Sequence, residues 1–203
     1  MSIKEGLKEY SWLSLLLSIL LIGCQDEITY TPKPRSYPKI DFPAKQYSAF
    51  NNSDCNFSFQ MPTYAVVKKK KDNGAFKVDH PCWFDIEIPQ LNGSIHCTYR
   101  DFSSRKELGG LIQDSYTLAE KHTAKAQYID DKTLDNGKVQ GLLFDIQGPT
   151  ATSVQFFLTD STSNYFQASL YFNNPPEPDS MAPIVEYVRK DIDHLIETFA
   201  FDR

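Results

Sequence analysis

The sequence has 203 residues, with 21 Lys and Arg, 26 Asp and Glu, and a formal net charge of −5. Its pI near 5.4 gives no electrostatic reason to expect nucleic-acid binding, which depends on a basic surface. The length allows one domain with a substantial core and is short for two. The basic run at residues 68–71 is followed by Asp72-Asn73-Gly74, so we interpret it as a solvated strand end entering a turn. A contact with anionic lipid or an acidic partner is the alternative.

An apolar run at residues 13–22 precedes Cys24 and contains two serines as its only polar residues. Its length is about ten residues, whereas a membrane-spanning helix needs roughly 20, so we interpret it as part of a signal peptide. The string Leu21-Ile22-Gly23-Cys24 is similar to the bacterial lipobox. We therefore predict that residues 1–23 are removed and that Cys24 becomes a membrane anchor carrying two or three acyl chains, such as palmitate. The alternative is cleavage elsewhere, with Cys24 an ordinary cysteine.

Residues 24–53 are rich in proline and show no apolar periodicity. Prolines at this density favour extended polyproline II backbone. We therefore expect a lipidated cysteine and a tether over residues 24–53, followed by a globular domain over residues 54–203. In the alternative interpretation, this arm packs onto the domain through its apolar side chains, which are Tyr37, Ile40, Phe42 and Tyr47.

Three cysteines remain if Cys24 carries lipid, and an exported chain favours their pairing. Cys55 and Cys82 lie where loops enter predicted strands, whereas Cys97 alternates with apolar residues along one strand face. We predict a disulfide between Cys55 and Cys82 and a free, buried Cys97. Pairing of Cys97 with either of the other two cysteines stays open.

Alternation of apolar and polar residues predicts antiparallel strands before and after a long helix. The segments with this alternation are residues 57–59, 64–70, 84–89, 94–100, 128–132, 139–147, 154–160 and 165–172. Ser104 and Glu107 fit a helix capping box, and the apolar stripe that follows predicts a helix of about 20 residues reaching Ala126. A second helix is expected from Ser180, with an apolar stripe that ends at Phe199.

This order of elements predicts an α+β domain with the succession β-β-β-α-β-β-β-α. We expect a single twisted, mainly antiparallel sheet of roughly five to seven strands with two covering helices. Asn92-Gly93 is predicted to form a hairpin turn because both residues tolerate positive φ. By fold-level analogy, the order is similar to the Mog1/PsbP-type α/β/α sandwich.

The sequence contains no motif typical of a catalytic or metal site. Gly-x-Ser-x-Gly, His-x-x-x-His, Cys-x-x-Cys and a Gly-rich phosphate loop are all missing. His122 is expected in the core beneath the first helix, and His194 in a helix-surface contact near Asp191 or Glu197. We therefore predict that the protein is not an enzyme, has no metal or cofactor, and has no small-molecule substrate.

Phe157, Tyr165 and Tyr171 fall out of phase with the buried residues of their strands. An outward aromatic row suits either a second helix layer, which we favour, or a partner surface that would also include Asp160 and His194. A deep cleft containing Asp160, Tyr165 and His194 would instead favour binding of a small ligand or an envelope polymer.

Several strings together resemble one family, the gliding-motility lipoproteins called GldD from gliding bacteria of the Bacteroidetes. Similar segments occur over nearly the whole mature chain, in the same order and spacing. They are Pro32-Lys33-Pro34, Tyr37, Phe42-Pro43, Ser53-Asp54-Cys55, Phe57, Phe59, Cys82-Trp83-Phe84, His122-Thr123-x-Lys125-Ala126, residues 155–162, Ser169-Leu170-Tyr171-Phe172 and residues 191–198.

The resemblance implies a lipid-anchored, non-enzymatic envelope component of gliding motility and the associated type IX secretion machinery. Its partners would be other envelope proteins, and the resemblance supplies no catalytic residues. Cys55 and Cys82 match family-like positions, which supports their pairing, whereas Cys97 and the turn Asn92-Gly93 are departures. We favour an outer-membrane anchor facing the periplasm over the inner membrane or the cell surface.

Overall fold

The computed structural model describes residues 39–52, 54–70 and 80–202. The predicted signal peptide, Cys24 and residues 25–38 therefore lie outside the described residues. In chain order the elements are β1 (Tyr47–Asn51), β2 (Phe57–Pro62), β3 (Val66–Lys69), β4 (Phe84–Ile88), the short 3-10 helix η1 (Pro89–Leu91), β5 (Gly93–Asp101), α2 (Arg105–Glu120), β6 (Tyr128–Asp135), β7 (Gln140–Gln147), β8 (Thr152–Thr159), β9 (Asn164–Phe172), α3 (Pro178–Thr198) and β10 (Ala200–Phe201).

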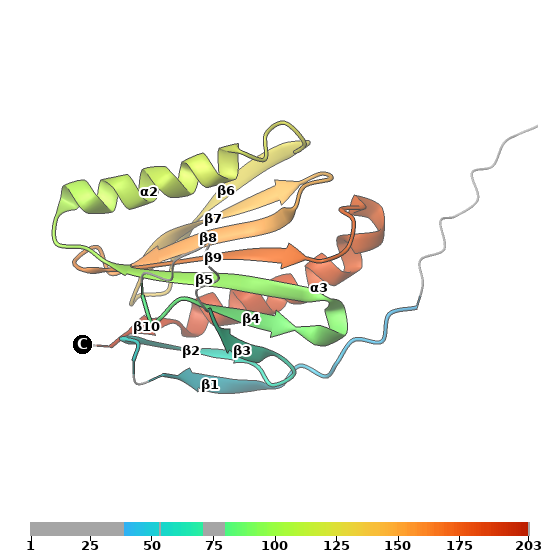
Figure 1. Ribbon diagram of the computed structural model, residues 1–203, viewed down its shortest axis with the longest axis horizontal. Coiled ribbons are helices and arrows are strands. Elements are labelled where there is room, and N and C mark those ends of the chain that lie inside the picture. The colour runs from blue at the N-terminus through green and yellow to red at the C-terminus, as the bar shows by residue number, and fades with distance from the viewer. Residues whose placement is uncertain (1–38, 53, 71–79, 203) are drawn as a thin grey trace, which may run out of the picture. The chain divides into compact units, whose positions relative to one another are not determined.

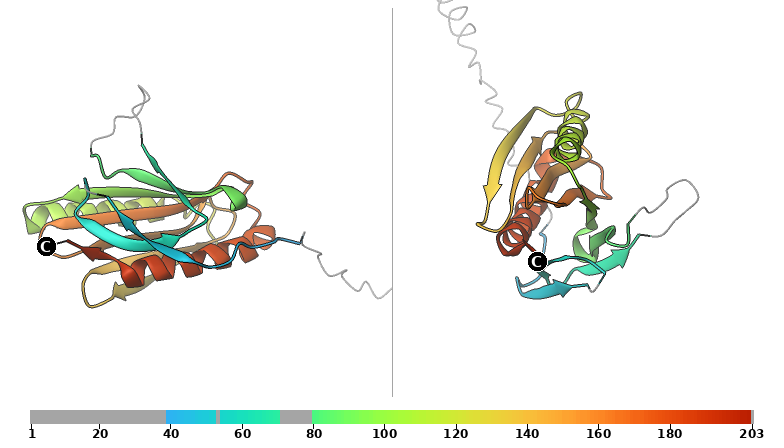
Figure 2. Two further views of the ribbon diagram at one scale, coloured as in Figure 1. Left: turned by 90° about the horizontal axis from the view of Figure 1, so that it is seen from below. Right: turned by 90° about the vertical axis from the view of Figure 1, so that its left-hand side faces the viewer.

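A seven-stranded sheet, in the order β3-β4-β5-β9-β8-β7-β6, forms the centre of the domain. Each neighbouring pair of its strands is antiparallel. Helices α2 and α3 cover opposite faces of this sheet (Figures 1 and 2). The predicted α+β class with two covering helices is therefore confirmed.

Two apolar cores lie on the two faces of the large sheet. The larger one contains Phe156 and Leu158 of β8 and the buried stripe of α3. The smaller one lies beneath α2 and contains Phe157 of the same strand. Since β8 is buried on both faces, its apolar residues run continuously instead of alternating with polar ones.

A second, three-stranded sheet in the order β1-β2-β10 departs from the predicted single sheet. Its first strand, β1, lies within residues 24–53, the segment predicted to be a tether. Phe50 of β1 is buried and stacks on Phe59 of β2, with ring centroids 4.6 Å apart. Burial of that ring gives this part of the arm a reason to pair with the domain.

The connections differ from the predictions in detail. Asn92 adopts the expected positive φ of 49°, but it ends η1, and Gly93 already belongs to β5. Helix α2 begins with the predicted capping interaction, in which the backbone N–H of Glu107 donates to Ser104 Oγ at 3.3 Å. It ends at Glu120, before the predicted Ala126, and a series of turns leads on to β6. Phe199 is the cap that follows α3 and has extended backbone angles.

The cysteines are arranged as the preferred pairing predicts. Cys55 and Cys82 form a disulfide that closes a loop with a sequence separation of 27. Cys97 is a buried free thiol, and burial raises its pKa well above the usual value. The disulfide joins the start of β2 to the segment that leads into β4, and so it ties the small sheet to the large one.

Candidate functional site: the Asp191 clasp

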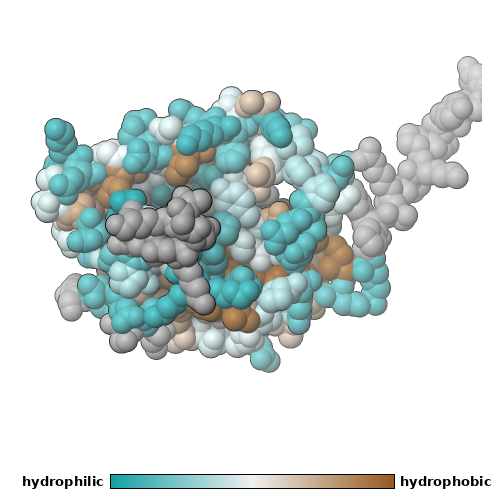
Figure 3. Space-filling view, in the orientation of Figure 1, coloured by the Kyte–Doolittle hydropathy of each residue, from teal (hydrophilic) through white to brown (hydrophobic). Residues whose placement is uncertain are grey.

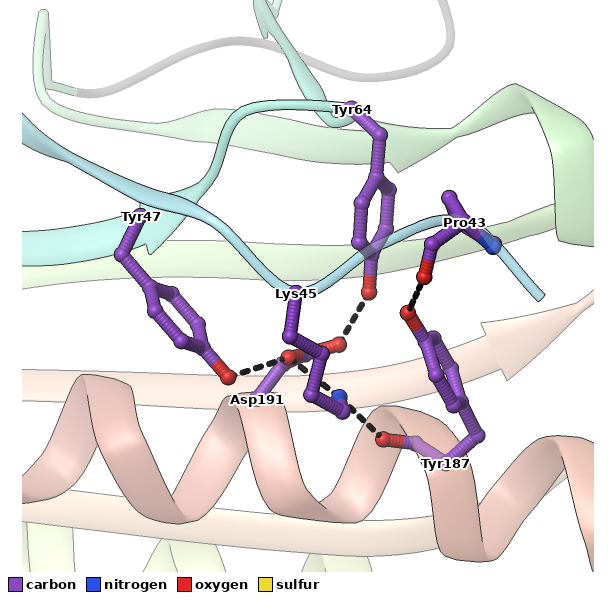
Figure 4. A network of polar contacts seen from close by, with 6 residues as sticks. All are labelled: Pro43, Lys45, Tyr47, Tyr64, Tyr187 and Asp191. Atoms are coloured by element: carbon purple, nitrogen blue, oxygen red, sulfur yellow. Dashed lines mark hydrogen bonds and ion pairs between the residues drawn. The ribbon is translucent and has the colours of Figure 1, made fainter.

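Asp191 is the most deeply buried charged residue of α3, with 2% of its surface exposed. Its Oδ1 accepts hydrogen bonds from Lys45 Nζ at 2.6 Å and Tyr47 Oη at 2.7 Å. Its Oδ2 accepts a hydrogen bond from Tyr64 Oη. Both carboxylate oxygens therefore accept hydrogen bonds. The donors are Lys45 in the segment before β1, Tyr47 at the start of β1 and Tyr64 in the loop after β2 (Figure 4). We call this group, together with Tyr187 and Pro43, the Asp191 clasp.

Tyr187 extends the clasp one turn toward the start of α3. Its hydroxyl donates to the carbonyl oxygen of Pro43, and its own carbonyl accepts a hydrogen bond from Lys45 Nζ at 2.9 Å. The Lys45 ammonium also lies 3.8 Å from the centroid of the Tyr187 ring, within the range of a cation–π contact. Phe42 stacks on the same ring at 4.4 Å. The arm is thus held along α3 from Phe42 to Tyr47.

The protonation of the two phenols suits this arrangement. Burial, and then the hydrogen bond to Asp191, raise the pKa of both Tyr47 and Tyr64 well above the usual value for tyrosine. Both hydroxyls therefore keep their protons and act as donors to the carboxylate. Both oxygens of the Asp191 carboxylate accept hydrogen bonds from donors within the chain. The carboxylate therefore has a structural role, and its geometry is not that of a free general base.

His194 lies next to the clasp, but its contacts differ from the predicted ones. It stacks on Tyr47 with ring centroids 3.8 Å apart, and its Nε2 lies 2.8 Å from Gln60 Oε1. Asp191 is committed to the arm, so the expected contact with His194 does not form. His122 lies after the end of α2 instead of within it, and it contacts Gln155 of β8 at 3.2 Å.

The suggested partner surface is not assembled. Phe157 and Tyr165 are buried beneath α2 with 5% and 2% of their surface exposed, so the second helix layer explains them. Tyr165 Oη also donates to the carbonyl oxygen of Leu111 in α2 at 3.1 Å. Tyr171 is half-buried beside the ring of His96 at 4.9 Å. These residues therefore offer no continuous aromatic surface.

Asp160 organises the turn between β8 and β9. Its carboxylate accepts hydrogen bonds from the backbone N–H groups of Thr162, Ser163 and Asn164, each at 2.9 Å. Burial alone would raise the pKa of this carboxyl group, but these hydrogen bonds, with one from the Asn164 side chain, lower it well below the usual range. Asp160 thus has a local structural role.

Replacing Asp160 with Asn is expected to destabilise the domain at pH 7 by about 1 kcal/mol, a modest value because the carboxylate is partly exposed. A depressed folded-state pKa gives stability that is complete above the unfolded value of about 3.9 and is lost as pH falls through the folded-state value. The difference between Asp160→Asn and wild type in urea unfolding should therefore shrink in strongly acidic solution. An equal difference at neutral and acidic pH would contradict this account of the turn.

The cavities in the described part of the domain include the following two. One has a volume of about 650 Å³ and lies between the first turns of α3 and the β7–β8 connection. The other, of about 300 Å³, lies between α2 and β6. Neither of these two cavities is lined by Asp160, Tyr165 or His194. Among the described residues there is no cluster of His, Cys, Asp and Glu suited to a metal ion.

The basic run is matched by acidic neighbours. Lys68 pairs with Glu87 at 2.5 Å, and Lys69 pairs with Asp54 at 3.0 Å. Lys70 pairs with Asp85 at 3.4 Å, and Lys71 lies outside the described residues. Figure 3 shows hydrophobic residues in small separate groups on the face that it presents. The ion pairs of Lys68, Lys69 and Lys70 favour the interpretation of the basic run as a solvated strand end.

The fold and the clasp define an α+β domain whose N-terminal arm is fastened to its last helix. The chain belongs to the family of the gliding motility lipoprotein GldD, whose model matches residues 27–201. The predicted family is therefore confirmed, and with it a lipoprotein associated with gliding motility and with the cell envelope. No similar protein was found among the curated proteins.

One solved structure serves for comparison. The solution structure of cyanobacterial PsbP (CyanoP) from Synechocystis sp. PCC 6803 has a TM-score of 0.48 and 7% sequence identity, over 78% of this chain and 94% of that chain. Within the residues that the structure describes, no helix is long and apolar enough to cross a membrane.

Proposed function

We propose that this protein is an envelope lipoprotein, anchored by acyl chains on Cys24, that serves gliding motility and the associated type IX secretion machinery through protein contacts. The observation that carries the proposal is the Asp191 clasp in a member of a gliding-motility lipoprotein family. The clasp fixes the arm on the Cys24 side of the domain to a buried residue of α3. In this proposal the position of the anchor reaches the folded domain through the clasp.

The polar groups of the domain support a role in binding rather than catalysis. Asp191 accepts three hydrogen bonds within the clasp, and Asp160 accepts hydrogen bonds from its own turn. Asp85 is likewise engaged by His96 and Lys70. Each of these acidic groups has a structural explanation, so we assign none of them to a reaction.

We place the anchor in the outer membrane with the domain in the periplasm. In this arrangement residues 1–23 are the signal peptide and the segment from Cys24 to the clasp spans from the membrane to the domain. The acidic segment Gln25-Asp26-Glu27 would then lie next to the lipid headgroups. Protection of the domain from added protease in intact cells, and its cleavage after the outer membrane is opened, would support this placement. Cleavage in intact cells would contradict it.

Replacing Cys24 with Ala in the chromosome is expected to abolish surface spreading and to reduce secretion of surface adhesins, because the domain loses its anchor. Spreading on agar and adhesin export measure the two effects. Gln25→Ala is the matched control, since it alters the neighbouring residue and keeps the cysteine. Normal spreading of the Cys24→Ala strain, with the protein at its usual level, would show that anchoring is not needed.

A second candidate function is binding of a small ligand or an envelope polymer, and the cavity of about 650 Å³ favours it. That volume lies within the range of small-molecule sites, and Met181, Val185 and Arg189 of α3 line it. Val185→Trp would narrow this cavity by adding a large ring to its lining. Unchanged spreading of a Val185→Trp strain would count against this function.

A further inference from the structure

We infer that the groove between α2 and β6 binds an extended, basic segment of a partner protein, which adds to the free edge of the large sheet. This inference rests on the proposed function, because it specifies one of the protein contacts that the function requires. It concerns a part of the domain that the clasp does not use.

The groove has an apolar floor. Ala119 and Phe144 form part of it, and they are only 2% and 3% exposed. Tyr116 of α2 packs against Phe144 edge to face, with ring centroids 5.1 Å apart. The volume of about 300 Å³ lies at the lower limit for small-molecule pockets, so it suits one large apolar side chain rather than a whole ligand.

The position of α2 leaves this groove open. The helix packs mainly against β8 and β9, while β6 is the outermost strand of the sheet. Ile129 of β6 therefore contacts the smaller core from beside the helix and not from beneath it. Tyr128, at the start of β6, keeps 53% of its surface exposed. A large exposed aromatic side chain at the mouth of an apolar groove is typical of an interaction surface.

The free edge of β6 is suited to pairing with another strand. All eight residues from Tyr128 to Asp135 pair with β7 in unbroken register, so the strand has no bulge. It also contains no proline. An extended segment can therefore form main-chain hydrogen bonds along the edge and place alternate side chains toward the groove.

The charges beside the groove select a basic partner. Glu120 of α2 and Asp131 of β6 line it, both are exposed, and no Lys or Arg lines it. Neither carboxylate has an ion pair within the described residues. Further along the strand, Asp130 and Asp135 add negative charge, offset only by Lys132. A second copy of this chain would bring the same acidic edge to the groove, so like charges oppose pairing of two copies.

The test uses the mature lipoprotein in detergent micelles and a synthetic peptide, Thr-Lys-Thr-Phe-Thr-Lys-Thr, whose Phe and two Lys side chains lie on the same face of an extended strand. We expect binding that protects the amides of β6 from hydrogen exchange. Changing the central Phe to Ser, or every Lys to Glu, should weaken it by about tenfold or more. The double variant Glu120→Lys/Asp131→Lys should show a similar loss, and so should Thr123→Trp, which fills the groove. Asp114→Lys/Glu197→Lys is the control with the same change in net charge, and it should bind normally.

Several outcomes would overturn the inference. They are no binding of the basic peptide, equal binding of the acidic peptide, protection away from β6, and unchanged binding by the groove variants. Spreading assays distinguish a failure of the groove inference from a failure of the proposed function. If Glu120→Lys/Asp131→Lys cells spread normally while Cys24→Ala cells do not, the groove is not the contact surface but the anchored function stands. If both strains spread normally, the proposed function itself fails.

Discussion

Replacing Asp191 with Ala is expected to lower the free energy of unfolding by about 3 kcal/mol, because it leaves a partly buried ammonium and two phenols without their acceptor. The Asp191 side chain is 1% exposed and that of Lys45 is 28% exposed. We expect the lower end of the range for buried ion pairs because water reaches the lysine. Urea unfolding of the mature protein measures the loss. Hydrogen exchange should also show that residues 45–50 open more readily, since the clasp holds this segment.

The matched control is Asp193→Ala, on the same helix. The Asp193 side chain is 49% exposed and pairs with Arg189 at 3.3 Å, so its loss should cost less than about 1 kcal/mol. Equal effects of the two substitutions would mean that Asp191 is no more than a surface charge. A large loss of stability without faster exchange in the arm would mean that the clasp does not hold the arm.

Replacing Phe57 with Ala is expected to cost about 3–5 kcal/mol, the range for removal of a large buried ring. Phe57 has no exposed surface and lies at the junction of the two sheets. Its ring contacts Phe166 of the large sheet at 5.2 Å and Phe199 at the end of α3 at 5.5 Å. The substitution therefore leaves a cavity where both sheets and α3 meet. Chemical unfolding followed by circular dichroism measures the effect.

Two further variants define the expected pattern for Phe57. Phe57→Leu keeps much of the volume and should cost clearly less than Phe57→Ala. Val66→Ala removes an apolar side chain that is 52% exposed and should change stability by no more than about 0.5 kcal/mol. A loss below about 1 kcal/mol for Phe57→Ala would show that the small sheet does not share the main core.

Much of the fold follows from local patterns that packing reinforces. Phe84, Ile86 and Ile88 alternate with acidic residues, and β4 has the buried and half-buried alternation that this pattern predicts. Ser104 begins α2 as predicted because its hydroxyl satisfies a backbone N–H that the helix leaves without a partner. Local signals of this kind do not depend on distant residues, so they can be read from the sequence.

The second sheet and the clasp depend on contacts between distant segments. Strand β1 pairs with β2 antiparallel, and β10 joins only through Ala200 and Phe201, which is too short for an alternating pattern. Lys45 and Asp191 are 146 residues apart in the chain. The apolar ring of Tyr47 favours packing of the arm on the domain, but the sequence contains no signal that links Tyr47 to Asp191. Three of the four prolines in this segment lie outside the described residues, and proline content does not show what the backbone packs against.

The aromatic residues show the limit of strand periodicity. A residue out of phase with its buried neighbours faces the other side of the sheet, but that side is a surface only if no second layer covers it. Helix α2 covers Phe157 and Tyr165, so these residues belong to a core. The groove exists because α2 packs over β8 and β9 and leaves β6, the outermost strand, uncovered. No local sequence motif predicts over which strands a helix packs.

The lipid anchor is the feature on which the proposed function depends. Mass spectrometry of the native protein, purified from cell envelopes, determines directly which residue begins the mature chain and what it carries. We predict an N-terminal peptide that begins at Cys24 and bears two or three acyl chains. An N-terminus without acyl chains, or one that begins at another residue, would contradict the account.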